Sequence, residues 1–429
     1  MRRTRVLLAT MTLTLLVASG VALGALLGTV SLAWGDPGAN STRSSASNPE
    51  SFPAGVGGGK QTPQGKQTPL LMRVLDPPQP VKGSDGKYHL VYELVLTNSS
   101  PGTATVESVK TLDAKSGEVV DTLEGADVSA RTVLLGDVSG QTAQKIGSGQ
   151  VALLFLDATF DDLRDVPKDV EHRVKTSFDI PPEFASNLFP AETTDTGGGT
   201  GVLNKKPVGI SPPLRGKNWV VANGCCTASP HRGAILGLAQ KLLAAERYAI
   251  DWIQADEEGR IILPDDNSRL TDFPAYGKPI LSVANGKVVK VVNKYSDVKP
   301  GVLDPDLTLK DAGGNHVIVY IGGGRYALYG HLKPDSIEVE EGDNVRRGQR
   351  IARLGNSGNT TAPHLHFHIM DAPLPLGADN NLPYVFDSYV LQGHYEDSVT
   401  PVLLDKPEAR QDELPLDLSL VTFPAPRGN

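Results

Sequence analysis

Three histidines at every second position constrain the fold of this chain more than any other feature. They lie in Thr361-Ala-Pro-His-Leu-His-Phe-His-Ile369, between residues that favour β-strands. Alternate side chains of a strand share one face, so His364, His366 and His368 are predicted to project together, with neighbours roughly 7 Å apart. Two imidazoles placed in this way can divide the work of a hydrolase, because one can ligate a metal while the other moves protons.

Two further features accompany this strand. A glycine-rich turn, Leu354-Gly-Asn-Ser-Gly-Asn-Thr-Thr-Ala-Pro363, leads into it, and Tyr329-Gly-His-Leu332 supplies another histidine, His331, upstream. An isolated His-x-His is usually a surface strand with solvated histidines. The combination of the turn, the strand and His331 instead favours a metal site.

Composition limits the class of protein. The chain has 429 residues, of which 39% are hydrophobic and 21% charged, enough for two or three globular domains. The net charge of -8 argues against a nucleic-acid partner, which would require a basic face. An uncharged or basic partner fits this charge better.

The first 35 residues have the pattern of a signal peptide or signal anchor. Arg2, Arg3 and Arg5 precede a run without charge from Val6 to Gly35. This run is longer than the usual signal-peptide core of about 7–15 residues and could span a bilayer, so the sequence leaves cleavage open. We expect export in either case, with membrane contact only through such an N-terminal anchor.

The rest of the chain is predicted to be mainly β. Short alternating runs such as Tyr88–Thr97 and Val151–Leu156 predict a β-sandwich-like domain, and seven of the nine histidines follow it. A short helix is expected around Ala234–Ala245 and a hairpin turning at Asn285-Gly286. The predicted organisation is a flexible linker at 36–68, the β-sandwich-like domain at 69–190, a second linker at 191–209 that includes Thr193–Gly201, a catalytic domain at 210–398, and a C-terminal extension at 399–429.

The two cysteines, Cys225 and Cys226, are adjacent. In an oxidising compartment they can form a vicinal disulfide, link to another molecule, or remain a buried thiol pair. They are weaker candidates for zinc ligands than the histidines, because oxidation competes with metal binding outside the cell.

The order of these motifs resembles the lysostaphin-type (LytM-type) zinc metallopeptidases over residues of about 215–390. The resemblance is carried by Pro279-Ile-Leu-Ser-Val-Ala-Asn-Gly-Lys-Val, Tyr329-Gly-His-Leu332, Val339-Glu-Glu-Gly-Asp-Asn-Val-Arg-Arg-Gly-Gln349 and His364-Leu-His366-Phe. It implies a glycine-rich antiparallel β fold of the duplicated hybrid motif type. It also implies an exported enzyme that cuts peptide bonds in bacterial peptidoglycan with one Zn²⁺ ion and no other cofactor.

The family pattern also implies roles for individual residues. By position, Asp251 is the carboxylate ligand, His366 an imidazole ligand, His364 the general base, and His331 the residue that stabilises the oxyanion. Zinc held by three protein ligands keeps one position open, where it acidifies water and polarises the scissile carbonyl.

One position departs from the family pattern. The family's first ligand is a histidine four residues before the aspartate, where this chain has Arg247, which cannot donate a lone pair. His231 lies in the preceding loop and is our candidate for the missing ligand, while Glu246 could also substitute. His368 is expected to be an outer or substrate-facing group, as is Arg247, and a purely structural role for His368 is equally compatible with the sequence.

Two functions follow from these residues. The first is an exported zinc endopeptidase of the cell wall, and the alternative is an inactive member of the same fold that binds peptidoglycan or activates another hydrolase. Retention of Asp251, His331, His364 and His366 together favours the enzyme. Bound metal would discriminate between the two.

Overall fold

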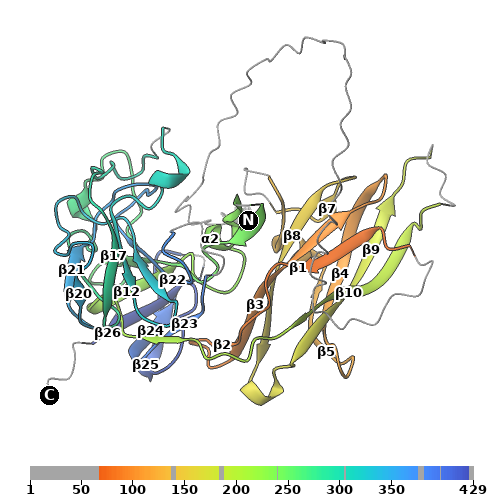
Figure 1. Cartoon of the computed structure of the whole chain (residues 1–429), viewed down its shortest axis with the longest axis horizontal. Helices are drawn as coiled ribbons and strands as arrows, with labels where there is room; N and C mark the ends of the chain where they lie inside the picture. The colour runs from red at the N-terminus through yellow and green to blue at the C-terminus, as the bar shows by residue number, and fades with distance from the viewer. Residues whose placement is uncertain are drawn as a thin grey trace, which may run out of the picture.

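The structure is a computed structural model that describes residues 67–136, 142–182, 188–238, 240–303, 306–374, 381–396 and 398–424. The expected export segment at 1–35 and all but the last two residues of the expected linker at 36–68 lie outside these ranges. Two β bodies stand side by side, with the short helix α2 (Pro230–Gly233) between them (Figure 1). Within the described residues, no helix is long and apolar enough to cross a membrane.

The N-terminal body is a sandwich of two five-stranded sheets in which every pairing is antiparallel. One sheet has the order β1-β3-β8-β6 with β2 beside β3, and the other has the order β10-β9-β4-β5 with β7 beside β4. The strands are β1 (Leu70–Val74), β2 (Val81–Lys82), β3 (Tyr88–Asn98), β4 (Thr103–Asp113), β5 (Val119–Glu124), β6 (Thr132–Leu134), β7 (Lys145–Ile146), β8 (Val151–Phe160), β9 (Asp169–Asp179) and β10 (Glu192–Gly201). A one-turn helix, α1 (Ala126–Ala130), connects β5 to β6.

Strand β3 is buried on both faces, and its alternation decides what each face contacts. Leu90, Tyr92, Leu94 and Leu96 belong to the core between the two sheets. The intervening side chains face the C-terminal body, and Val91 belongs to the core of that body. The sandwich therefore packs this face of β3 against the C-terminal body.

The C-terminal body is built on one ten-stranded antiparallel sheet with the order β20-β17-β18-β19-β22-β15-β12-β26-β24-β25. Its strands are β12 (Gly216–Ala222), β15 (Ile250–Gln254), β17 (Gly286–Val292), β18 (His316–Tyr320), β19 (Tyr326–Tyr329), β20 (Asn344–Val345), β22 (Leu365–Met370), β24 (Tyr389–His394), β25 (Val402–Arg410) and β26 (Ser419–Phe423). Smaller two-stranded sheets pair β11 (Val208–Ile210) with β23 (Tyr384–Phe386), β13 (Ile235–Leu238) with β14 (Lys241–Ala244), and β16 (Pro279–Leu281) with β21 (Arg350–Arg353).

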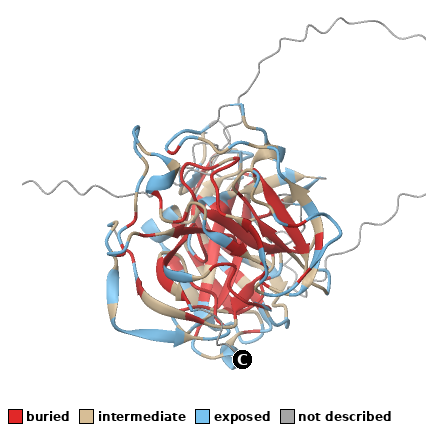
Figure 2. Ribbon diagram, turned by 90° about the vertical axis from the view of Figure 1, so that its left-hand side faces the viewer, coloured by how far each residue is buried: buried red, intermediate tan, exposed pale blue. Residues whose placement is uncertain are grey.

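Aromatic side chains fill the core beneath this sheet. The Trp252 ring packs edge to face on Phe423 with 5.0 Å between centroids and on Phe386 with 5.9 Å. Buried strands occupy the centre of the body and exposed segments form its rim (Figure 2). On β22, Leu365, Phe367 and Ile369 enter this core, so the alternating histidines must face the other way. The prediction of a mainly β chain is confirmed.

Two of the predicted boundaries are wrong. Thr193–Gly201, expected to be a flexible linker, lies in β10 and pairs with β9, because threonines favour a strand once a partner edge is available. The stretch from residue 399, expected to be an extension, contributes β25 and β26 to the large sheet, where β26 pairs with both β12 and β24.

Two local predictions also differ from the structure. The segment around Ala234–Ala245 forms the β13–β14 hairpin instead of a helix. The residues flanking Asn285-Gly286 do not pair with each other, since β16 pairs with β21 and β17 pairs with β18. Gly286 is needed for close packing, because a Cβ there would collide with the Tyr320 carbonyl.

Candidate metal centre

The candidate site lies where β15 runs between β22 and β12. Asp251 on β15 stands directly opposite His366 on β22 and opposite Ala222 at the end of β12. Ile250 and Trp252 enter the core, so the Asp251 side chain points to the opposite face. The register thus places a carboxylate and the alternating histidines on one surface.

His231 reaches this surface from helix α2, in the loop that follows β12. Its Nδ1 lies 2.9 Å from the carbonyl oxygen of Asn223 and 3.2 Å from that of Ala249. Carbonyl oxygens only accept hydrogen bonds, so Nδ1 carries the hydrogen and donates it. Nε2 then faces Asp251, with 3.2 Å to Oδ2. One ligand atom from each of His231, Asp251 and His366 lies within 4.8 Å of the others.

His364 approaches the same carboxylate from the end of the glycine-rich turn. Its Nδ1 lies 2.8 Å from the Ala362 carbonyl and donates to it, and its Nε2 lies 3.3 Å from Asp251 Oδ1. Thr360 Oγ1 also lies 3.2 Å from Nδ1. The ring is thereby held with Nε2 toward Asp251.

His331 completes the group from the loop after β19. Its ring centroid lies 4.6 Å from that of His364 and 5.8 Å from that of His366. Its backbone has φ 57°, a left-handed conformation, and its Nδ1 donates to the Ser357 carbonyl over 2.8 Å. Gly314 packs closely on the same residue, since a Cβ there would collide with the Ser357 carbonyl.

The donors fit a metal ion. In neutral rings, the Nε2 lone pairs of His231 and His364 would face a carboxylate, which is repulsive unless a cation or a proton lies between them. Nε2 of His231 is buried and has no hydrogen-bond partner. Two imidazoles and one carboxylate are the donors that Zn²⁺ takes at catalytic sites with an open position.

The same geometry shifts the pKa of the charged groups. Burial alone would raise the pKa of Asp251, but His231 and His364 hold it well below its usual value. Burial would lower the pKa of His231, yet the Asp251 carboxylate raises it to about 9. Burial and the neighbouring His364 and His366 lower the pKa of His331 well below its usual value. Asp251 is therefore ionised, ready to bind a cation.

Glu246 and His368 lie on the other edge of the His366 ring. His366 contacts Asp251 through Nδ1 at 2.9 Å, whereas its Nε2 lies 3.4 Å from Glu246 Oε1 and 3.2 Å from His368 Nδ1. The Nε2 edge of the His366 ring points away from the Nδ1 edge that contacts Asp251. This arrangement therefore favours His231 over Glu246 as the ligand that would share a metal ion with Asp251 and His366. Burial lowers the pKa of His368 well below its usual value, so this ring is neutral.

Arg247 does not face the cluster. Its guanidinium lies 2.5 Å from Glu93 Oε2 and 3.1 Å from Asp76 Oδ2, both in the N-terminal body. Arg247 therefore pairs across the two bodies. Arg247 is 5% exposed, which leaves little surface for the substrate contact that we considered.

Asn223 is a site residue that the sequence prediction missed. Its side-chain Nδ2 donates to Asp251 Oδ2 over 2.7 Å, while its carbonyl accepts from His231. Its φ of 56° is left-handed, and the Asn-Gly pair directly after a strand was the available signal. Asn223 joins the carboxylate and the loop histidine in one network.

The loop between Asn223 and His231 contains the cysteines. Cys225 and Cys226 form a disulfide with each other and are buried. Of the three states that the sequence left open, the structure has the vicinal disulfide. Two other histidines of the C-terminal body lie outside the cluster: His316 donates from Nδ1 to the Gly314 carbonyl, and exposed His394 lies 3.4 Å from Glu396.

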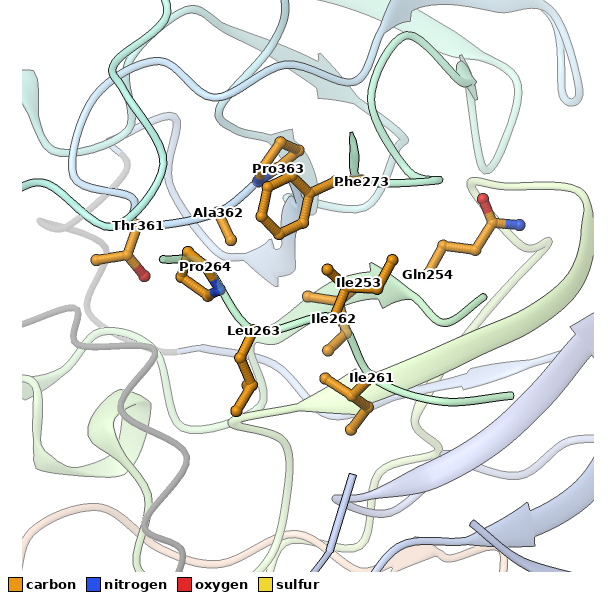
Figure 3. A pocket seen from close by; sticks show the side chains of 10 residues that line it. All are labelled: Ile253, Gln254, Ile261, Ile262, Leu263, Pro264, Phe273, Thr361, Ala362 and Pro363. Carbon is orange, nitrogen blue, oxygen red and sulfur yellow. The ribbon is translucent and has the colours of Figure 1, made fainter. Parts of the chain in front are cut away.

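Figure 3 shows an apolar pocket whose lining includes residues that neighbour the cluster in sequence. It shares Ile253 with β15, where the two-residue spacing puts Ile253 on the same strand face as Asp251. Pro363 and Ala362, which directly precede His364, line another side, and Leu263 and Phe273 close the pocket. Apolar surface therefore lies next to the candidate proton-transfer group.

Comparisons with known proteins identify a family for part of the chain. Residues 267–377 match the model of Peptidase family M23, which includes His331, His364, His366 and His368, whereas His231 and Asp251 precede the matched range. Peptidoglycan DD-endopeptidase ShyB of Vibrio cholerae is 34% identical over 109 residues, 25% of this chain and 21% of the relative. Peptidoglycan DD-endopeptidase ShyA of the same organism is 40% identical over 65 residues, 15% of each chain. The matches thus span about a fifth or less of the length of these curated relatives.

Two solved structures align with part of this chain. The catalytic domain of lysostaphin from Staphylococcus simulans aligns with 20% identity over 38% of this chain and 88% of its own length, with a TM-score of 0.22. LytU aligns with 24% identity over 40% of this chain and 85% of its own length, with a TM-score of 0.23. As the motifs predicted, residues 267–377 form a domain of peptidase family M23, the lysostaphin/LytM type.

Proposed function

We propose that the protein is an exported zinc endopeptidase that hydrolyses peptide bonds of bacterial cell-wall peptidoglycan. The observation that carries this proposal is the buried cluster of His231, Asp251 and His366, next to His364. Membership of residues 267–377 in family M23 and similarity to two peptidoglycan endopeptidases support the reaction and the substrate class.

His231, Asp251 and His366 would hold a single Zn²⁺ ion. When bound, zinc acidifies water and polarises the carbonyl of the scissile bond. Asn223 orients the carboxylate of Asp251, and the two carbonyls at His231 Nδ1 fix the tautomer that leaves Nε2 free to ligate.

His364 is suited to act as the general base. Its Nδ1–H is held by the Ala362 carbonyl, so Nε2 is the atom that accepts a proton from the attacking water. His331 is held in the same tautomer by Ser357. Its lowered pKa keeps the ring neutral with Nε2 as an acceptor, so His331 would stabilise a developing oxyanion only after Nε2 takes up a proton during the reaction.

The apolar pocket supports a peptide substrate. Its position along β15 from Asp251 would let it hold an apolar side chain next to the bond that is cut. A polypeptide backbone bound across β15 and the glycine-rich turn would thus be oriented before reaction.

The inactive alternative is a cell-wall binding or activating module. It is favoured by the burial of the cluster, in which His231 and Asp251 are each 1% exposed and His366 is 6% exposed. Zinc content and wall hydrolysis separate the two functions. We expect the purified full chain to contain one zinc per molecule and to hydrolyse peptidoglycan, with the activity lost on chelation and restored by zinc. A wild-type protein that binds no zinc would refute the enzyme and leave the binding module.

A further inference from the structure

The N-terminal sandwich contacts the C-terminal body through the outward face of β3. Val91, Glu93 and Val95 alternate on this face, and Glu93 is fully buried. Burying a carboxylate between two apolar neighbours costs free energy unless it is paired with positively charged groups. The partners of Glu93 therefore indicate its structural role.

Both partners of Glu93 are arginines of the C-terminal body. Oε1 lies 3.0 Å from Nη2 of Arg232, and Oε2 lies 2.9 Å from Nε and 2.5 Å from Nη2 of Arg247. Asp76 on the sandwich also contacts Arg247. Two carboxylates and two guanidinium groups balance in charge, so the buried cluster is neutral only with Glu93 ionised.

The two arginines lie close in sequence to two of the candidate ligands. Arg232 directly follows His231 on α2, and Arg247 lies four residues before Asp251. Arg232 also donates to the Cys226 carbonyl over 2.6 Å and to the Tyr92 carbonyl over 2.8 Å. One side chain of the sandwich thus contacts arginines in two of the three segments that bring ligands to the site, and α2 lies between the two bodies (Figure 1).

We propose that Glu93 is a positioning residue of the metal centre, which makes the N-terminal sandwich part of the active site's scaffold. This inference rests on the proposed zinc site. Without the Glu93 charge, two guanidinium groups would remain buried, Arg247 with Asp76 in contact and Arg232 with no carboxylate in contact among those described, only the charge of Asp157 nearby. Arg232 would then gain most by moving toward water, and its movement would carry His231 away from Asp251.

The test measures zinc binding by the full chain carrying Glu93→Gln. Loss of a supporting partner behind metal ligands typically weakens metal affinity by about 10–100-fold, and we expect a loss of that size. The dissociation constant would be measured by competition with a chelating dye. The absorption spectrum of the Co²⁺-loaded protein should change as well, since it reports the number of ligands.

Glu413→Gln is the matched control. Glu413 is also a buried carboxylate that joins the two bodies, through Lys82 at 2.9 Å, but it does not contact the segments that carry the ligands. It should lower the free energy of unfolding and leave zinc affinity unchanged. A general loosening of the interface would weaken zinc binding equally in both variants, and that result would overturn the proposal.

Further outcomes test the role proposed for Glu93. A folded Glu93→Gln protein with wild-type affinity and Co²⁺ spectrum would overturn the proposal while leaving the zinc site intact. If Glu93→Gln does not fold, Glu93→Asp decides, because it keeps the charge and shortens the reach. We expect it to bind zinc more weakly than the wild type, and wild-type binding would overturn the proposal. Failure of the wild type to bind zinc would instead reject the proposed function.

Discussion

Replacing His231 by alanine is predicted to abolish tight zinc binding as severely as His366→Ala does. Asp251 and His366 would remain as two protein ligands, whereas catalytic zinc sites normally use three. Since even an outer partner costs about 10–100-fold in affinity, removal of a ligand should raise the zinc Kd by more than about 100-fold.

The same substitution also affects the apo protein. His231 Nδ1 is one donor shared between the carbonyls of Asn223 and Ala249, and both lose it. An unsatisfied buried group costs about 1–3 kcal/mol, so the variant should fold with reduced stability. His316→Ala is the matched control, because His316 is also buried with Nδ1 on a backbone carbonyl and lies outside the cluster.

His364→Ala separates ligation from proton transfer. It should keep zinc and lose about 10²–10⁴-fold in turnover, because a general base does not hold the ion. Zinc content by elemental analysis, zinc Kd by chelator competition and wall hydrolysis would be measured on all four variants. Full zinc occupancy and activity in His231→Ala would show that the loop histidine is a bystander.

Three further predictions concern other parts of the molecule. Burial lowers the pKa of His172 to about 4. In the unfolded chain the same imidazole takes up a proton near pH 6.5, so the free energy of unfolding should fall by about 3 kcal/mol between pH 6.5 and 4. Urea titrations should show this loss shrinking in His172→Gln, and an unchanged pH dependence would contradict the assignment. Leu263→Arg places a charge in the apolar pocket. It should raise KM about tenfold with zinc content unchanged, because the substrate would lose the free energy of burying one apolar side chain. An unchanged KM would show that the pocket does not bind substrate. Cys225 and Cys226 should not react with thiol reagents until reductant is added, and two freely titrating thiols in the folded protein would reject their disulfide.

The parts of the site that follow from short-range periodicity were predictable. The alternation in β22 sends Leu365, Phe367 and Ile369 to the core, and this alone places the histidines on the opposite face. Asp251 between Ile250 and Trp252 follows the same rule. These segments are short, strongly patterned and buried on one side, so local sequence and tertiary packing favour the same register.

The errors have a different origin, because they depend on distant partners. Thr193–Gly201 has the composition of a linker, but it forms a strand because it can pair with the edge of β9. The β13–β14 segment contains leucine and alanine, which favour a helix, but Ile235 packs against apolar residues of the sandwich and the hairpin forms instead. Asn223 and Glu93 act on the site through contacts 28 and more than 130 residues away in sequence, beyond any local pattern.

Arg247 shows why a departure from a family motif needs a structure for its interpretation. Read as a lost ligand, it suggests a dead site, because its permanent charge would repel a metal ion. In the structure its guanidinium is turned to Glu93 and Asp76, so that charge is neutralised away from Asp251. His231 meanwhile presents Nε2 to Asp251 from the loop after β12. On our proposal, position 247 anchors the catalytic domain to the sandwich, and the ligand function lies at His231. The two positions are linked through Glu93, which pairs with Arg247 and with Arg232, the residue after His231. The loop after β12, the segment before β15 and the N-terminal domain are thus joined in one cluster.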